Sequence, residues 1–197
     1  MERTQVQRWA KSLRIMVGVL IVCNIIALFF VPAMVWLAPD GLFVEIEERV
    51  LHLMKIRPYG EDDIYIPIFM LALASWMEVF HDVVHLLYTV FFLICGSCSL
   101  IILRQARCIL DTILEGNPFQ IANANSMRRA AVCCWVVSGA AFVRMIAELM
   151  RHHSTAPLYT YNTLFVPVFL MAGLLFLVMS ALFRQAAELK EDQDLTI

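Results

Sequence analysis

Charge is what this sequence has least of. Only 16% of its 197 residues are Asp, Glu, Lys or Arg, whereas 61% are hydrophobic. A soluble domain is about a quarter charged and roughly half apolar. Helices of a soluble four-helix bundle would also carry charged outer faces, yet three of the four longest apolar stretches contain no charged residue. The composition therefore argues against a soluble bundle and favours a membrane protein.

Motifs that carry common chemistry are also missing. The sequence has no nucleotide-binding loop and no nucleophile motif, which argues against the main enzyme classes that short motifs identify. It has no basic recognition helix for direct nucleic-acid binding, and no internal repeat or low-complexity segment. We therefore expect a non-enzymatic protein without a cofactor and without direct contact to nucleic acid.

Four long apolar runs organise the chain, at about 15–37, 83–103, 130–149 and 164–182. Each is close to the roughly 20 residues that a helix needs to cross a bilayer. The first run follows a basic segment, but it is too long for a signal-peptide core and no A-x-A cleavage site follows it. We predict a single all-α domain, an integral membrane four-helix bundle whose first partner is the lipid bilayer.

The charges that are present are distributed unevenly. Segment 1–14 has four basic residues against one acidic, segment 104–129 has four against two, and segment 38–82 has nine acidic residues against three basic. Positive charge is retained in the cytoplasm. This predicts a multi-pass protein of the bacterial inner membrane with both termini, including the tail 183–197, and the 104–129 loop in the cytoplasm. Segments 38–82 and 150–163 would then lie outside.

The outer segment 38–82 has structure of its own by its periodicity. Apolar residues recur at helical spacing over 42–56, with charged residues on the other side, which is typical of an amphipathic helix. Residues 58–63 indicate a turn, and 66–80 are apolar enough for a second helix. That helix either extends the second span or lies in the membrane interface, and the pattern is compatible with both.

The cytoplasmic loop is expected to be partly helical. Helical spacing continues from the second run through Leu114, and Gly116–Phe119 indicate a turn that ends the helix. Asn123 or Asn125 would cap the third helix, because Asn is a preferred residue at helix N-termini.

Small residues in the last two runs predict a close contact between helices. Ser138, Gly139, Ala140 and Ala141 lie in the third run, and Ala172 and Gly173 in the fourth. Small side chains allow membrane helices to approach each other.

All six cysteines lie in or beside the apolar runs, and none lies in an outer segment, where disulfides would persist. Cys95 and Cys98 form a C-x-x-C pattern, which raises a thiol-redox enzyme as one alternative. The intervening Gly96 and Ser97 favour the simpler interpretation that small residues pack against a neighbouring helix.

A cluster of potential ligands precedes and enters the second run. Its spacing of i, i+3, i+4 and i+7 predicts one helix face made by Glu78, His81, Asp82 and His85. Histidine and carboxylate at such spacing bind zinc or another divalent metal. The alternative is a polar cap at the end of the span, which needs no ligand.

Two charges lie inside the third run, Arg144 and Glu148. Intramembrane charges face a partner or a wet cavity, and the i,i+4 spacing lets these two pair with each other. Arg144 is also within conceivable reach of Glu78, since both lie at outer helix ends. The site is either a structural ion pair or an outer pocket that binds a ligand.

Two motifs resemble a known family. The loop reads G-x-P-F, then Asn, then a hydrophobic-Arg pair, and the chain closes on D-L-T-I. These motifs fall on Gly116, Pro118, Phe119, Asn123, Met127, Arg128, Asp194, Leu195, Thr196 and Ile197. They resemble the bacterial membrane family called domain of unknown function 2975. This chain departs from the family in its longer and more acidic segment 38–82.

The resemblance implies four spans and no established activity. Members of that family often sit beside a small helix-turn-helix DNA-binding protein, which implies a membrane partner for a regulator. The leading hypothesis is a regulatory or sensing partner of a cytoplasmic transcription factor. Its docking residues would be Gly116, Pro118, Phe119, Asn123, Arg128, Asp194, Thr196 and Ile197. The alternatives are a transporter or channel component, alone or as a homo-oligomer, and a metal-binding or thiol-redox enzyme.

Overall fold

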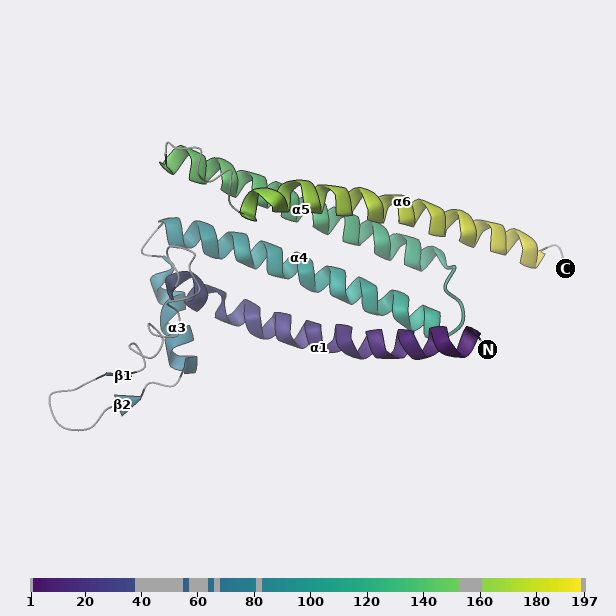
Figure 1. Ribbon diagram of the computed structural model, residues 1–197, viewed down its shortest axis with the longest axis horizontal. Coiled ribbons are helices and arrows are strands. Elements are labelled where there is room, and N and C mark those ends of the chain that lie inside the picture. Colours follow the sequence, from purple (N-terminus) through teal and green to yellow (C-terminus); the bar gives the residue numbers. More distant parts are fainter. Residues whose placement is uncertain are drawn as a thin grey trace. The chain divides into compact units, whose positions relative to one another are not determined.

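Four long helices dominate the computed structural model (Figure 1). They are α1 (Glu2–Leu37), α4 (Val83–Leu114), α5 (Ile121–His152) and α6 (Tyr161–Leu195). The smaller elements are β1 (Lys55–Ile56), β2 (Ile64–Tyr65) and α3 (Ile68–Glu78). The structure describes residues 2–37, 55–56, 64–65, 68–80, 83–152 and 161–195.

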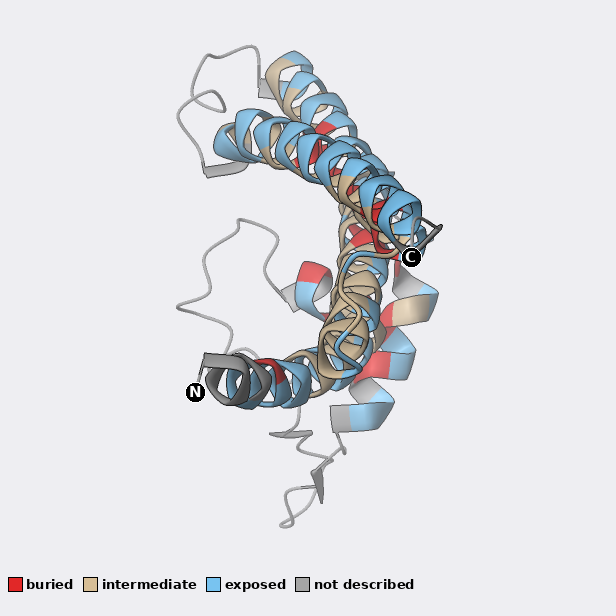
Figure 2. Ribbon diagram, turned by 90° about the vertical axis from the view of Figure 1, so that its right-hand side faces the viewer, coloured by how far each residue is buried: buried red, intermediate tan, exposed pale blue. Residues whose placement is uncertain are grey.

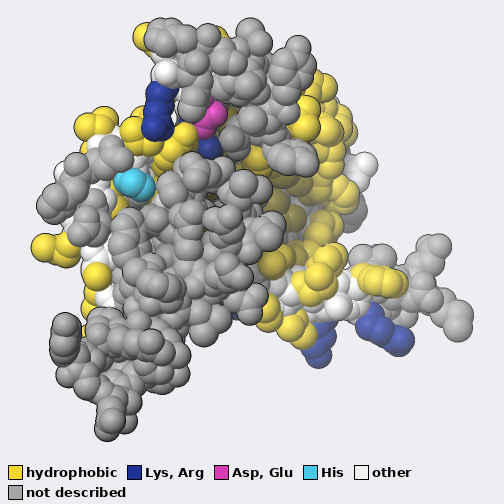
Figure 3. All heavy atoms as spheres, turned by 60° about the vertical axis from the view of Figure 1, so that its left-hand side comes forward, with side chains coloured by type: hydrophobic (Ala, Val, Ile, Leu, Met, Phe, Trp, Pro, Cys, Tyr) yellow, Lys and Arg dark blue, Asp and Glu magenta, His cyan; other side chains and the backbone are white. Residues whose placement is uncertain are grey.

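Each long helix contains one of the predicted apolar runs and is long and apolar enough to cross a membrane. Side chains along these helices are largely exposed, as Figure 2 shows for α1 and α6. The described part of the face in Figure 3 is mainly hydrophobic, with few charged side chains. Exposed apolar helices of this length require lipid around them. The chain is thus an all-α, multi-pass membrane protein, as predicted.

The chain divides into two compact units. The first comprises Met1–Ile25 with Ile94–Ile197, and the second comprises Ile26–Leu93. Helices α1 and α4 therefore contribute to both units, while α5 and α6 belong to the first alone.

Helices α5 and α6 pack side by side in the first unit (Figure 1). One close contact is at Gly173, where an added Cβ would lie 2.4 Å from the Trp135 ring. Ser138 Oγ also donates a hydrogen bond to the Val166 carbonyl oxygen, at 2.9 Å. The predicted contact between the third and fourth runs exists, but Gly139 takes no part in it, because nothing lies within 4 Å of its Cβ position. Gly173 packs against an indole instead of a small residue.

The cysteines of α4 and α5, apart from the exposed Cys108, are packing residues of the first unit. Cys98 and Cys133 form a buried cluster with Val137, and Ile94 and Cys95 pack against it. All six cysteines are free thiols. Free buried cysteine behaves as a small hydrophobe, so the geometry fits the packing interpretation of the C-x-x-C pattern.

Helix α3 packs on the end of α1 in the second unit. The Phe69 and Phe29 rings stack with centroids 5.6 Å apart. Trp76 Nε1 donates a hydrogen bond to the Phe29 carbonyl oxygen at 3.2 Å. A turn at Val79–Phe80 follows α3, and α4 begins only at Val83. Helix α3 is therefore a separate element and does not extend the second span.

The predicted amphipathic helix over 42–56 is only partly testable. Residues 42–54 lie outside the described residues. Lys55 and Ile56 form β1 instead of helix, pairing antiparallel with Tyr65 and Ile64 of β2. The helical prediction was wrong at these two positions because their backbone bonds across to a second strand, a non-local contact that local periodicity does not register.

Candidate functional site

The long helices exceed what a bilayer can cover. Helices α1 and α6, with 36 and 35 residues, are each more than 50 Å long at about 1.5 Å per residue. The hydrocarbon layer is about 30 Å thick. Helix ends must therefore project beyond it, and in the first unit the turn between α4 and α5 joins two helix ends.

Gly116 shapes this turn. Helix α4 ends at Leu114 and Gly116 has a φ of 79°, the left-handed conformation that glycine adopts without steric cost. The backbone N–H of Asn117 bonds to the Thr112 carbonyl at 3.1 Å, and that of Gly116 to the Ile113 carbonyl at 3.1 Å. This pair of bonds is the Schellman motif. The predicted helix end and turn are confirmed.

Asn123 fastens the turn from the other side. Its side chain is only 1% exposed, and Nδ2 donates to Thr112 Oγ1 and to the Pro118 carbonyl oxygen, both at 2.7 Å. Thr112 Oγ1 in turn donates to the Ile109 carbonyl at 2.8 Å. Helix α5 begins at Ile121, so Asn123 lies in the first turn and is no N-cap. The capping prediction was wrong because α5 begins two residues before Asn123, and also before Asn125.

Helix α6 closes over the same turn. Ser180 Oγ donates to the Ala124 carbonyl oxygen at 2.7 Å, and Lys190 Nζ donates to Asn117 Oδ1. The Phe183 and Phe119 rings lie 5.7 Å apart between centroids. These three contacts hold the second half of α6 against the turn.

Helix α1 joins the arrangement through one ion pair. Arg14 Nε lies 2.7 Å from Asp111 Oδ1, with both side chains partly exposed. We call these interlocking side chains of the described residues the turn cluster. It consists of Arg14, Asp111, Thr112, Asn117, Phe119, Asn123, Ser180, Phe183 and Lys190.

The turn exposes the acidic Glu115 and, beyond it, several apolar and cationic side chains. Phe119 is 47% exposed although its ring packs on Phe183, and Ile121 is equally exposed. Arg128 and Arg129, both about two turns into α5, are exposed as well. We call these four side chains the turn surface. Its chemistry is aromatic, aliphatic and cationic.

The predicted docking residues divide in two. Gly116, Phe119 and Arg128 are exposed and Pro118 is half-buried. Asn123 is buried and contributes by holding the turn in place. The side chain of Asp194, and Thr196 and Ile197 altogether, lie outside the described residues.

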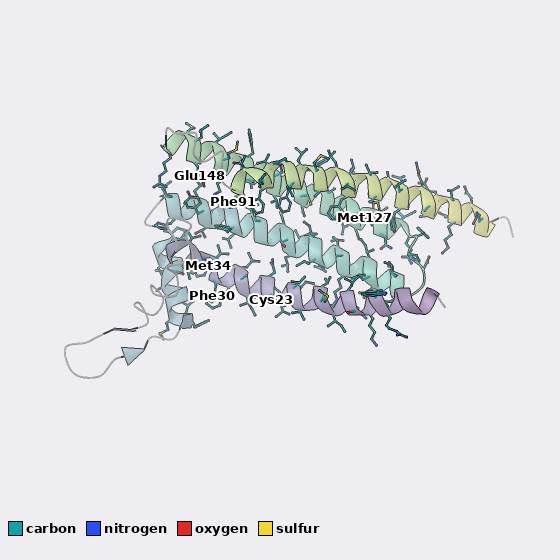
Figure 4. The ribbon with its side chains drawn as sticks, viewed as in Figure 1. Cys23, Phe30, Met34, Phe91, Met127 and Glu148 are labelled. Atoms are coloured by element: carbon teal, nitrogen blue, oxygen red, sulfur yellow. The ribbon has the colours of Figure 1, made fainter. Side chains whose placement is uncertain are left out.

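The second predicted site lies towards the other end of α5. Arg144 Nε and Glu148 Oε1 lie 2.8 Å apart, with side chains only 13% and 12% exposed. Figure 4 shows Glu148 near the C-terminal end of α5 and Met127 near its N-terminal end. Glu148 is 19 residues from Arg129, which is about 28 Å along a helix. The predicted i,i+4 pair is confirmed. Its distance from the turn surface is close to the thickness of the hydrocarbon layer.

The predicted metal cluster does not form one helix face. The turn at Val79–Phe80 separates Glu78, the last residue of α3, from His85 on α4. The spacing assumed a continuous helix, and the break invalidates it. His81, Asp82 and the Glu78 side chain lie outside the described residues. Among the described residues, no three His, Cys, Asp or Glu side chains are close enough together to hold a metal ion.

Residues 62–197 match a family model described as "Protein of unknown function (DUF2975)". The match covers more than half of the chain. The chain belongs to this family. The matched residues include α3, α4, α5 and α6 and every member of the turn cluster except Arg14. No curated protein and no solved structure matches the chain.

Several residues of the turn cluster escaped the sequence analysis. Thr112, Asn117, Ser180 and Lys190 are ordinary polar residues in the sequence, and each finds its partner on another helix or in the turn. For Thr112 and Asn117 the available signal was their type, polar residues beside a tight turn that also carries Pro; Ser180 and Lys190 lie far from that turn in sequence. Their pairing partners depend on helix packing, which local patterns do not specify.

Proposed function

We propose that this member of the DUF2975 family is a non-enzymatic membrane docking protein. Its turn surface faces the cytoplasm of a bacterium, at the inner membrane, and binds a cytoplasmic regulatory protein, a small transcription factor. Membrane insertion retains positive charge in the cytoplasm, and the first unit concentrates Arg and Lys at the end that carries the turn surface.

The observation that carries this proposal is the set of contacts by which the turn cluster holds the turn in place. Contacts from α1, α4 and α6 hold the turn, while Phe119 and Arg128 stay exposed. A surface that is already ordered loses less entropy on binding. Aromatic and arginine side chains also dominate the energetics of protein interfaces. The expected partner presents acidic groups around an apolar pocket.

Crosslinking in the host, followed by purification of the full-length chain and identification of its partners, tests the proposal. The informative variant is Arg128→Glu with Arg129→Glu, which reverses the charge of the turn surface without touching the turn cluster. The matched control is Arg151→Glu, because Arg151 is also exposed on α5 but lies at its opposite end.

We expect a DNA-binding regulator with the wild type and with the control, and at least a tenfold loss with the double variant, which corresponds to about 1.4 kcal/mol. Deletion of residues 192–197 probes the tail in the same assay. Docking at the turn surface is wrong if no regulator is recovered with the wild type, or if the double reversal leaves recovery unchanged.

A further inference from the structure

Helices α1 and α4 face each other in register near the turn. Arg14 pairs with Asp111. One helical turn further along α1, a Cβ added to Gly18 would lie 3.9 Å from Arg107 Nη1. Gly18 lies four residues after Arg14 in α1, and Arg107 lies four residues before Asp111 in α4. Gly18 and Arg107 therefore continue the facing stripes that the ion pair begins.

The charges at this crossing do not cancel. Asp111 is taken by Arg14, and the structure places no carboxylate of its described residues in an ion pair with Arg107. Two arginines against one aspartate leave a net charge of +1. Arg107 is exposed, so its guanidinium is available to an anion from outside the bundle.

Gly18 leaves room for that anion. Outside its own helix backbone and its chain neighbours, Arg107 Nη1 is the one heavy atom of the described residues within 4 Å of its Cβ position. The missing side chain of Gly18 thus leaves free space beside the guanidinium, over the helix backbone. We call this space the open step. A guanidinium presents a rigid fork of donors that matches phosphate geometry.

The depth of the crossing indicates the source of the phosphate. Gly18 lies inside the first apolar run, and the α1 side chains around it, Ile15, Val19 and Val22, are exposed and apolar. A cationic group beside an exposed apolar helix surface is complementary to a phospholipid, which has an anionic headgroup and apolar acyl chains. The headgroup phosphate would contact Arg107 and Arg14, and an acyl chain would lie along Val19 and Val22. Basic pockets between membrane helices bind anionic lipids in this way.

We propose that the α1–α4 crossing binds the phosphate of an anionic phospholipid, between Arg107 and the open step at Gly18, with Arg14 as the second cation. The site is distinct from the turn surface and does not depend on the docking function.

The test measures lipid retention by native mass spectrometry on the purified full-length chain. The probes are phosphatidylglycerol and, as the zwitterionic reference, phosphatidylethanolamine. Arg107→Gln removes the free cation. Gly18→Leu keeps every charge but fills the open step, and it replaces glycine with a better helix former. Arg129→Gln is the control, because it removes an exposed cation of α5 that lies near the α4–α5 turn but outside the proposed site. Circular dichroism and gel filtration confirm that each variant is folded.

We expect the wild type to retain phosphatidylglycerol preferentially. Arg107→Gln and Gly18→Leu should each lower that retention at least about fivefold, equivalent to about 1 kcal/mol, with less than a twofold effect of Arg129→Gln. Excess inorganic phosphate should not displace the lipid, since it lacks the acyl contacts. Displacement by phosphate would reassign the site to a soluble anion. An equal loss in all three variants, or no preference over phosphatidylethanolamine, would overturn the proposal.

Discussion

Asn123 shows how much a single buried amide contributes to this protein. Its two donors are both used, one on Thr112 and one on the Pro118 carbonyl. The residue therefore joins the last turn of α4, the connection and the first turn of α5. A buried donor or acceptor that loses its partner costs about 1–3 kcal/mol, so the cost of losing this side chain should be large for one residue.

Asn123→Ala should lower the free energy of unfolding by about 1–3 kcal/mol, because it removes two buried hydrogen bonds, to Thr112 Oγ1 and to the Pro118 carbonyl, which keeps only the Gln120 N–H as a donor. Asn125→Ala is the matched control, since Asn125 lies two residues further along the same helix and is exposed. Denaturant titration in detergent, followed by circular dichroism, gives both values. Equal stability of the two variants would show that the buried hydrogen bonds contribute nothing.

The Arg144–Glu148 pair gives a second prediction at this scale. Both side chains are largely buried, and removing one partner of a buried pair typically costs about 3–5 kcal/mol, whereas replacing both is far less costly. Arg144→Met and Glu148→Leu should each destabilise the chain more than the double variant does. Unfolding titrations of the three variants measure the coupling. A double variant as unstable as the sum of the singles would mean that the two residues act independently.

The sequence alone predicted some of these residue roles. Arg144 and Glu148 lie four residues apart on one helix, and helical geometry suffices to pair them. Asn123 was assigned to capping and docking, but it is a buried clamp because Thr112 meets it across the turn. Local spacing predicts contacts within a helix and carries no information on contacts between helices.

At the scale of elements, each apolar run became a helix. A helix end could be predicted where a residue type marks it. Helix α4, for example, ends just before Gly116, whose positive φ is a conformation that glycine favours. The break between α3 and α4 was left open, because residues 66–80 and the second run are both apolar. Packing of α3 on Phe29 of α1 accompanies the break, and that contact is remote in sequence.

The α5–α6 pair allows a prediction with an internal control. Gly173→Ala places a Cβ 2.4 Å from the Trp135 ring, and overpacking of this kind costs about 1–3 kcal/mol. Gly139→Ala meets no atom within 4 Å, so it should be neutral or stabilise the helix by up to about 1 kcal/mol.

Thermal unfolding of both variants, and of Gly173→Ala combined with Trp135→Ala, measures the effect. Because alanine has no ring, Trp135→Ala should remove the loss of stability that Gly173→Ala causes. If the penalty persists in the double variant, the contact with the indole is not its cause.

For the whole molecule, four spans would place both termini on one side of the membrane, and the charge distribution predicts which side that is. The family match contributes no orientation, and segment 38–61 and α1 lie outside the matched range. The predicted orientation therefore depends on charge alone: basic residues gather at the α4–α5 turn, and acidic ones in segment 38–82.

Cysteine labelling tests this orientation directly. With the six native cysteines replaced by alanine, Glu115→Cys places one thiol at the α4–α5 turn and Arg151→Cys places one at the opposite end of α5; both positions are exposed. A membrane-impermeant maleimide added to intact spheroplasts should label Arg151→Cys and should label Glu115→Cys only after permeabilisation. The reverse pattern would place the turn surface outside the cell, where no transcription factor could reach it. The proposed docking function would fail with it, whereas the phospholipid site at Arg107 would stand, since anionic lipid is present in both leaflets of a bilayer.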